Sequence, residues 1–141
     1  MPPFTRITLP DLLIEEVVQH AREAAPIECC GLLAGHISEG VGIATTRFAI
    51  ANDLRGVTDY LTNARDMLFA FRAMRERDLE LLAIYHSHPT SDPVPSRRDI
   101  EGNTYGESVV HLIVGFGAAE PEVRAWWLAE SGYREAEWAV E

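Results

Sequence analysis

The segment Leu79–His86 constrains the fold more than any other part of the chain, because it is almost continuously apolar. A strand with one face in water alternates apolar and polar residues, whereas a strand buried on both faces does not. The run therefore predicts a strand that is covered on both sides. Val41–Ile50, rich in β-branched residues, and the apolar run Val109–Phe116 predict further strands.

Two segments carry apolar residues at helical spacing, and they predict helices over Asp11–Ala25 and Asn63–Arg77. The remaining expected elements are strands at Gly31–Gly35, Val123–Leu128 and Tyr133–Val140, a turn at His36–Gly40, a polar loop at Asn52–Thr62 and a short helix from Ser96 to about Gly102. The order of these elements is helix, hairpin, helix, strand, loop and three strands. It predicts an α/β fold in which a mixed, mostly antiparallel sheet is flanked by helices.

The composition fits one globular domain that spans residues 1–141. Apolar residues make up 47% of the chain and charged residues 24%, which excludes a disordered chain. No apolar run approaches the ~20 residues that a membrane span needs. Acidic residues and prolines interrupt the first residues where a secretory signal needs an apolar stretch. We therefore expect a cytoplasmic protein that does not interact with membranes.

The charge and the cysteines exclude further classes. The formal net charge is −10, from 22 acidic and 12 basic residues, and phosphates would be repelled, so we expect no nucleic-acid partner. The two cysteines, Cys29 and Cys30, are adjacent, which makes a disulfide framework very unfavourable and predicts small buried residues. Nothing in the sequence specifies an oligomeric state.

A cluster of potential metal ligands lies at the end of the buried strand. His86 and His88 are two residues apart, so both imidazoles lie on the same face of a strand. Pro89 ends the strand directly afterwards. Asp99, at the end of the following proline-rich loop, is a plausible third ligand. Three such ligands plus water predict one Zn²⁺ per chain at a site with an open position.

Two further residues have the chemistry of hydrolysis. Glu28 precedes the apolar Gly31–Gly35 strand, so partial burial would raise its pKa, and it is the candidate general base. Ser96 is a candidate hydrogen-bond donor to the oxyanion of a tetrahedral intermediate. Ser96 and Asp99 also fit a helix capping box, in which an Asp99 oxygen that closes the cap would be lost to the metal. The sequence leaves both interpretations open.

The same residues carry a family resemblance. His86, His88, Ser96 and Asp99 stand in an H-x-H-x7-S-x2-D pattern, and Glu28 lies upstream in the order Glu-Cys-Cys-Gly-Leu-Leu. This pattern resembles the JAMM, or MPN-plus, metalloproteases. The resemblance implies an MPN-like domain, zinc on His86, His88 and Asp99, Glu28 as base and Ser96 as oxyanion support. It also implies hydrolysis of the bond after the C-terminal Gly-Gly of a ubiquitin-like or sulfur-carrier protein, in a compact stand-alone prokaryotic type.

Two other functions compete with this one. A non-catalytic MPN-type interaction module is the alternative, although such relatives typically lack metal residues that are present here. A zinc nucleobase deaminase needs H-x-E and a downstream P-C-x-x-C, and the chain has neither. His20, His36 and His111 have no partner spacing and are expected to be solvated or core residues.

Overall fold

The computed structural model describes residues 2–141, which form seven strands and three helices. In chain order these elements are β1 (Arg6–Leu9), α1 (Asp11–Ala24), β2 (Cys30–Ser38), β3 (Val41–Ile50), α2 (Ala64–Glu76), β4 (Glu80–His88), α3 (Arg97–Glu101), β5 (Val110–Gly115), β6 (Glu122–Ala129) and β7 (Gly132–Val140). Both predicted long helices are present. Asn63 caps α2, since its side chain accepts a hydrogen bond from the backbone N–H of Asp66.

The strands form one mixed sheet that closes into a barrel in the order β1-β3-β2-β4-β5-β6-β7. The pairs β2/β3, β2/β4, β5/β6 and β6/β7 are antiparallel, and β1/β3, β1/β7 and β4/β5 are parallel. The predicted α/β fold with a mostly antiparallel sheet is therefore confirmed. Closure depends on β1, which the sequence did not predict because four residues are too few to show a period.

The predicted hairpin is longer than expected. Strand β2 continues to Ser38, so the turn consists only of Glu39 and Gly40 and not of the whole segment from residue 36 to 40. Both residues have positive φ, 52° and 77°, as a two-residue turn between right-twisted strands requires. Glycine adopts this conformation without strain, which accounts for Gly40 at the second position.

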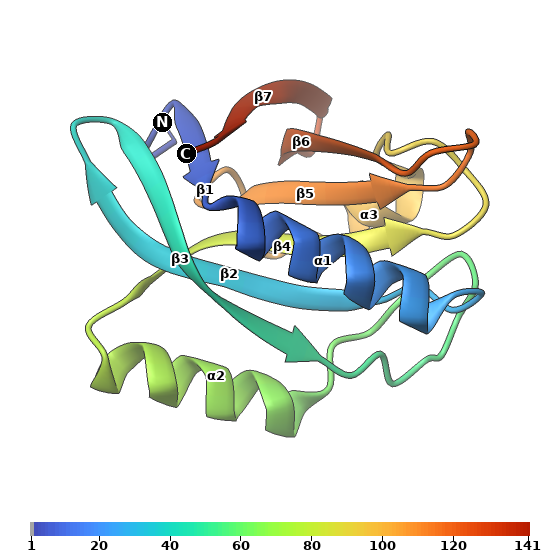
Figure 1. Cartoon of the computed structure of the whole chain (residues 1–141), viewed down its shortest axis with the longest axis horizontal. Coiled ribbons are helices and arrows are strands. Elements are labelled where there is room, and N and C mark those ends of the chain that lie inside the picture. Colours follow the sequence, from blue (N-terminus) through green and yellow to red (C-terminus); the bar gives the residue numbers. More distant parts are fainter. Residues whose placement is uncertain (1) are drawn as a thin grey trace.

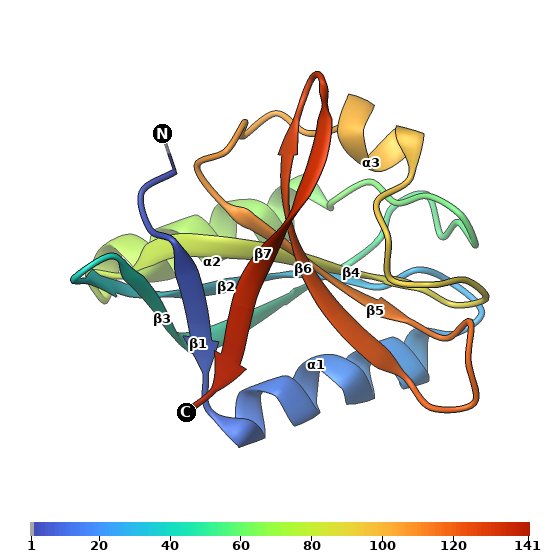
Figure 2. The ribbon, with the colours of Figure 1, turned by 90° about the horizontal axis from the view of Figure 1, so that it is seen from above.

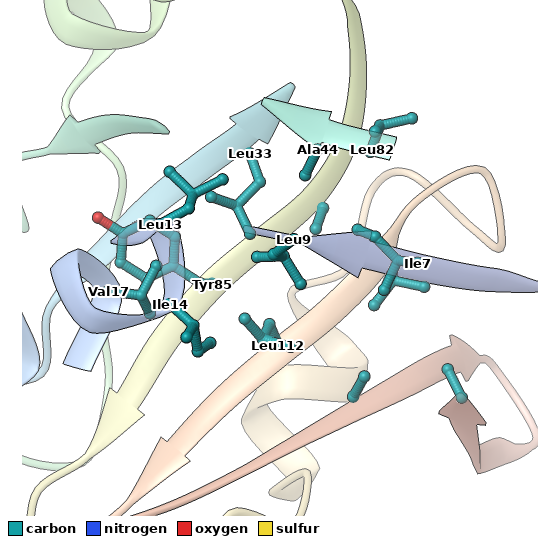
Figure 3. Packing of buried hydrophobic residues seen from close by; sticks show 14 of the residues in the cluster. Ile7, Leu9, Leu13, Ile14, Val17, Leu33, Ala44, Leu82, Tyr85 and Leu112 are labelled. Carbon is teal, nitrogen blue, oxygen red and sulfur yellow. The ribbon is translucent and has the colours of Figure 1, made fainter. Parts of the chain in front are cut away.

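The helices cover opposite faces of the sheet. Figures 1 and 2 show α1 on one side of β4 and β5, and α2 and α3 on the other. The buried residues on the α1 side, of which Figure 3 shows a part, include Leu13, Val17 and Tyr85. Those on the α2 side include Met74 and Ile84. Within residues 2–141 no helix is long and apolar enough to span a membrane.

Strand β4 carries buried residues on both faces, as its apolar run predicted. Tyr85 contributes to the α1 side and Ile84 to the α2 side. Because strand side chains alternate, His86 and His88 lie on the face of Ile84. Both are buried, with 0% and 6% of their surface exposed. The two covered faces of β4 thus place the pair of imidazoles inside the protein.

Gly31 is required where β2 passes the ring of Tyr85. A Cβ at Gly31 would overlap the Tyr85 ring. The ring cannot move aside easily, because Tyr85 is fully buried and its hydroxyl contacts His20 Nδ1 at 2.7 Å and accepts a hydrogen bond from Arg47 at 3.0 Å.

We expect Gly31→Ala to lower the free energy of unfolding by about 1–3 kcal/mol, the usual cost of overpacking. Chemical denaturation of the two proteins measures this difference. In the double variant Gly31→Ala/Tyr85→Leu the new methyl group has space. The double variant should therefore lose less unfolding free energy than the two single variants lose in total. Additive losses would contradict the steric explanation.

Candidate metal centre

His86, His88 and Asp99 meet where the end of β4 contacts the start of α3. The Nε2 atoms of the two histidines are 3.2 Å apart. Asp99 Oδ1 lies 3.2 Å from His86 Nε2, and Asp99 Oδ2 lies 3.2 Å from His88 Nε2. One ligand atom from each residue falls within 4.8 Å of the others, so the group could hold a metal ion. The structure brings together the three residues that the sequence selected.

The capping box of α3 directs the carboxylate of Asp99 at the histidines. Ser96 Oγ accepts a hydrogen bond from Asp99 N at 3.1 Å, and Ser96 N donates to Asp99 Oδ2 at 2.9 Å. The cap that the sequence offered as an alternative is therefore present. It occupies Oδ2 and leaves Oδ1 outside the cap, so a carboxylate with two oxygens can serve both purposes.

Hydrogen bonds and charge fix the protonation of these groups. His88 Nδ1 donates to the carbonyl oxygen of Asp92 at 2.8 Å, which fixes the ring with Nε2 directed towards Asp99. Burial alone would raise the pKa of Asp99, but hydrogen bonds from His86 and His88 outweigh it and hold that pKa well below its usual range. Asp99 is therefore an anion at all working pH values.

Glu28 lies directly before β2, and only 3% of its surface is exposed. Its backbone is fixed on both sides: Glu28 N donates to Gly56 O at 2.8 Å, and the side-chain amide of Asn52 donates to Glu28 O at 3.0 Å. The Oε1 atom has no hydrogen-bond partner among the described residues. Burial raises the pKa of Glu28 to about 8, and the charge of nearby His88 partly opposes this shift.

The segment from residue 52 to 62, predicted only as a polar loop, encloses the centre. Asn52 organises it with hydrogen bonds to the backbone of Glu28, Leu54, Asp59 and Leu61. The ring of Tyr60 stacks on His86 with centroids 4.8 Å apart. The sequence did not predict this contact, although Tyr60 is the one aromatic residue between positions 52 and 62.

Three buried residues near the centre lie outside the predicted motif, namely Cys29, Cys30 and His111. Cys29 and Cys30 are buried and free, as expected. His111 is also buried, but neither of its ring nitrogens has a partner among residues 2–141. Burial lowers the pKa of His111 to about 4, helped by the charge of His86. Because its spacing matched no motif, nothing in the sequence singled this histidine out.

The chain is similar to known proteins over most of its length. It is 30% identical over 123 residues to a CysO-cysteine peptidase of Mycobacterium tuberculosis, covering 87% of this chain and 83% of that relative. It is 35% identical over 95 residues to a probable TtuB-protein conjugate cleaving protease of Thermus thermophilus, covering 66% and 60%. A solution structure of a Desulfitobacterium hafniense protein superposes with a TM-score of 0.86 at 27% identity, covering 96% and 92%.

The family model that describes prokaryotic homologues of the JAB domain matches residues 10–129. This range contains both long helices, the loop that encloses the centre, and the segment from β4 to α3. The resemblance drawn from His86, His88, Ser96, Asp99 and Glu28 is therefore confirmed at the level of the family. The chain belongs to the prokaryotic homologues of the JAB domain.

Proposed function

We propose that this protein is a zinc-dependent peptidase or isopeptidase that hydrolyses the bond after the C-terminal Gly-Gly of a ubiquitin-like or sulfur-carrier protein. The observation that carries the proposal is the convergence of His86, His88 and Asp99, with ligand atoms within 4.8 Å of one another. The buried carboxyl group of Glu28 lies beside them.

The donor set and its spacing fit zinc. Imidazole nitrogen and carboxylate oxygen bind Zn²⁺ at roughly 2.0–2.2 Å, so two ligands of a tetrahedral site lie roughly 3.3 Å apart. The distances of 3.2 Å between His86 Nε2, His88 Nε2 and the Asp99 oxygens match this value. Zinc held by these residues would keep one position for water and would lower the pKa of that water to roughly 7.

Glu28 has the properties of a general base. Its Oε1 atom is free of hydrogen bonds among the described residues, and the fixed backbone on both sides holds the carboxyl group in place. A bound dication would favour the ionised form of Glu28, and this carboxylate could then accept a proton from water. The same carboxyl group can then pass this proton to the leaving amine.

Ser96 can support the oxyanion without giving up its cap. The cap uses Ser96 Oγ as an acceptor for Asp99 N, and within residues 2–141 no acceptor takes the hydroxyl hydrogen. That hydrogen is available to the negative oxygen of a tetrahedral intermediate. The serine thus has one atom with two independent hydrogen-bonding functions.

The names of the relatives support the substrate class. One relative is called a CysO-cysteine peptidase and another a TtuB-protein conjugate cleaving protease. The centre here is narrow, since the Tyr60 ring lies on His86 and both histidines are almost fully buried. A chain without Cβ atoms passes such a constriction most easily, which favours Gly-Gly at the cleaved bond. The non-catalytic alternative leaves the unpaired buried carboxyl of Glu28 without a use.

The first expected outcome concerns the metal. Purified protein should contain about one zinc per chain, and His88→Ala should lose most of it because two remaining ligands bind weakly. Elemental analysis after dialysis against trace zinc measures both. His36→Ala is the matched control, since His36 is exposed at the far end of β2. Equal zinc in wild type and His88→Ala would exclude this ligand set.

The variant Glu28→Gln tests whether Glu28 acts as a general base or as a metal ligand. The amide cannot accept a proton, so kcat should fall by roughly 10²–10⁴ while zinc content and fold are retained. Cleavage of a ubiquitin-like protein extended past its Gly-Gly, followed by mass spectrometry, provides the rate. If purified Glu28→Gln contains no zinc, Glu28 is instead a metal ligand.

The pH dependence of stability in the metal-free protein tests whether the pKa of Glu28 is raised. Its folded pKa of about 8 lies above the ordinary value of 4.5, so the folded state keeps a proton that the unfolded state releases. The stabilisation is complete below 4.5 and is lost as the pH rises towards 8. Denaturation midpoints across this range should fall in the wild type and fall less in Glu28→Gln.

Ser96→Ala should affect both stability and turnover. Loss of the cap costs about 1 kcal/mol, and loss of the oxyanion donor should lower kcat by roughly 10²–10³ with zinc retained. Asn63→Ala is the matched control, because it removes the side-chain cap of α2 from a residue that is neither a candidate metal ligand nor the candidate base. If both variants lose stability and neither loses turnover per folded molecule, Ser96 is only a cap.

A further inference from the structure

A cavity of about 180 Å³ lies beside the metal centre, on the side of the enclosing loop. It is bounded by the end of that loop, by the segment after α3, and by β4 and β5. Its walls include Tyr60, Met67, Ile84, Asp99, Tyr105 and His111. Because Asp99 also belongs to the metal centre, the cavity leads directly to the candidate metal ligands.

His111 is the unusual residue of this cavity. It is 3% exposed, and neither ring nitrogen has a hydrogen-bond partner among the described residues. Buried polar atoms in proteins are almost always paired, because an unpaired one costs free energy. A neutral imidazole offers one donor and one acceptor, so a ligand with both groups would satisfy it.

The strand register relates His111 to the metal centre. His111 pairs with Ile84 on the neighbouring parallel strand, and His86 lies two residues further along the same face of β4. Two residues of strand rise roughly 6.6 Å, the same length as two residues of an extended peptide. An extended tail with its Gly-Gly at Tyr60 and His86 therefore places the preceding residue over His111.

The opposite side of the centre suits the leaving group. Beyond His88 the chain enters a loop in which Thr90, Ser91 and Asp92 are exposed. The names of the two peptidase relatives differ in the group released, which is cysteine in one name and a protein in the other. An open side accommodates leaving groups of different size, whereas an enclosed cavity suits the part of the substrate that stays constant.

The walls of the cavity define the chemistry of the side chain it accepts. Met67 and Ile84 provide apolar surface for a methylene stem, and His111 offers the hydrogen-bonding groups. At the rim, Arg98 is paired with Asp59, so their charges offset each other. The Asp99 carboxylate faces His86 and His88, and a neutral imidazole cannot compensate a buried charge, so a charged side chain would be disfavoured.

We propose that this cavity is the subsite for the residue that precedes Gly-Gly, and that His111 selects an uncharged side chain with a terminal carboxamide, such as glutamine. The inference rests on the proposed function, since it assumes that a Gly-Gly tail occupies the centre. His111 is in this scheme a specificity-determining residue and takes no part in the chemical step.

The test uses the zinc-loaded full chain and fluorogenic peptides that end in Gln-Gly-Gly, Leu-Gly-Gly or Glu-Gly-Gly before the cleaved bond. We expect kcat/KM for the glutamine peptide to exceed the leucine value by roughly tenfold, which corresponds to one buried polar group left unpaired. His111→Phe should remove this preference while zinc content stays unchanged. His36→Phe is the matched control, and His111→Leu, which also lacks hydrogen-bonding groups, replaces His111→Phe if the larger ring prevents folding.

A binding measurement separates this inference from the proposed function. The uncleaved tail peptides are titrated into zinc-loaded Glu28→Gln, and the ring C–H resonances of His111 are followed by NMR. The glutamine peptide should shift these resonances and bind more tightly than the leucine peptide. If no peptide is cleaved by the wild type but this discrimination is seen, the proposed function is wrong and the subsite is supported.

Two results would overturn the subsite while leaving the proposed function intact. One is equal cleavage of the glutamine and leucine peptides, with His111 resonances unmoved by either. The other is a His111-dependent preference for the residue after the cleaved bond, which would make the cavity a leaving-group site.

Discussion

The carboxylate of Asp99 is the group on which the arrangement of this centre depends. It closes the N-terminal cap of α3 through Ser96 and faces the two imidazoles at the end of β4. A helix of only five residues would be marginal by itself. The cap and the imidazoles together hold it against the sheet. The helix cap and the group of candidate metal ligands thus share one carboxylate, so a change at Asp99 would disturb both.

The second feature on which the centre depends is its cover, which the segment from residue 52 to 62 provides with little regular structure. Asn52 distributes its hydrogen bonds over the backbone of Glu28 and of the loop itself, so the loop and the carboxyl group are positioned together. Burial then raises the pKa of Glu28 to about 8. A carboxyl group in water would not be so basic, so the burial of Glu28 gives it a property that suits the proposed general base.

Much of the fold and of the centre was predictable because local patterns carry it. The apolar run that ends at His86 required cover on both faces, and α1 and α2 provide it. The spacing of His86, His88 and Asp99 predicted a metal site at the strand end, and Ser96 with Asp99 offered a helix cap as the other interpretation. Strand β1 and barrel closure were not predictable, because pairing between the two ends of the chain leaves no local signal.

The sequence by itself determined which residue types are available and which of them share a face, since these follow from the periods of strands and helices. It therefore determined the candidate ligands and the candidate base. Only the tertiary structure decided that the cap and the imidazoles share one carboxylate, that Tyr60 covers His86, and that His111 lies unpaired among the described residues in a cavity leading to Asp99. These contacts join segments far apart in the chain, and their distances depend on how the closed sheet and the enclosing loop pack together.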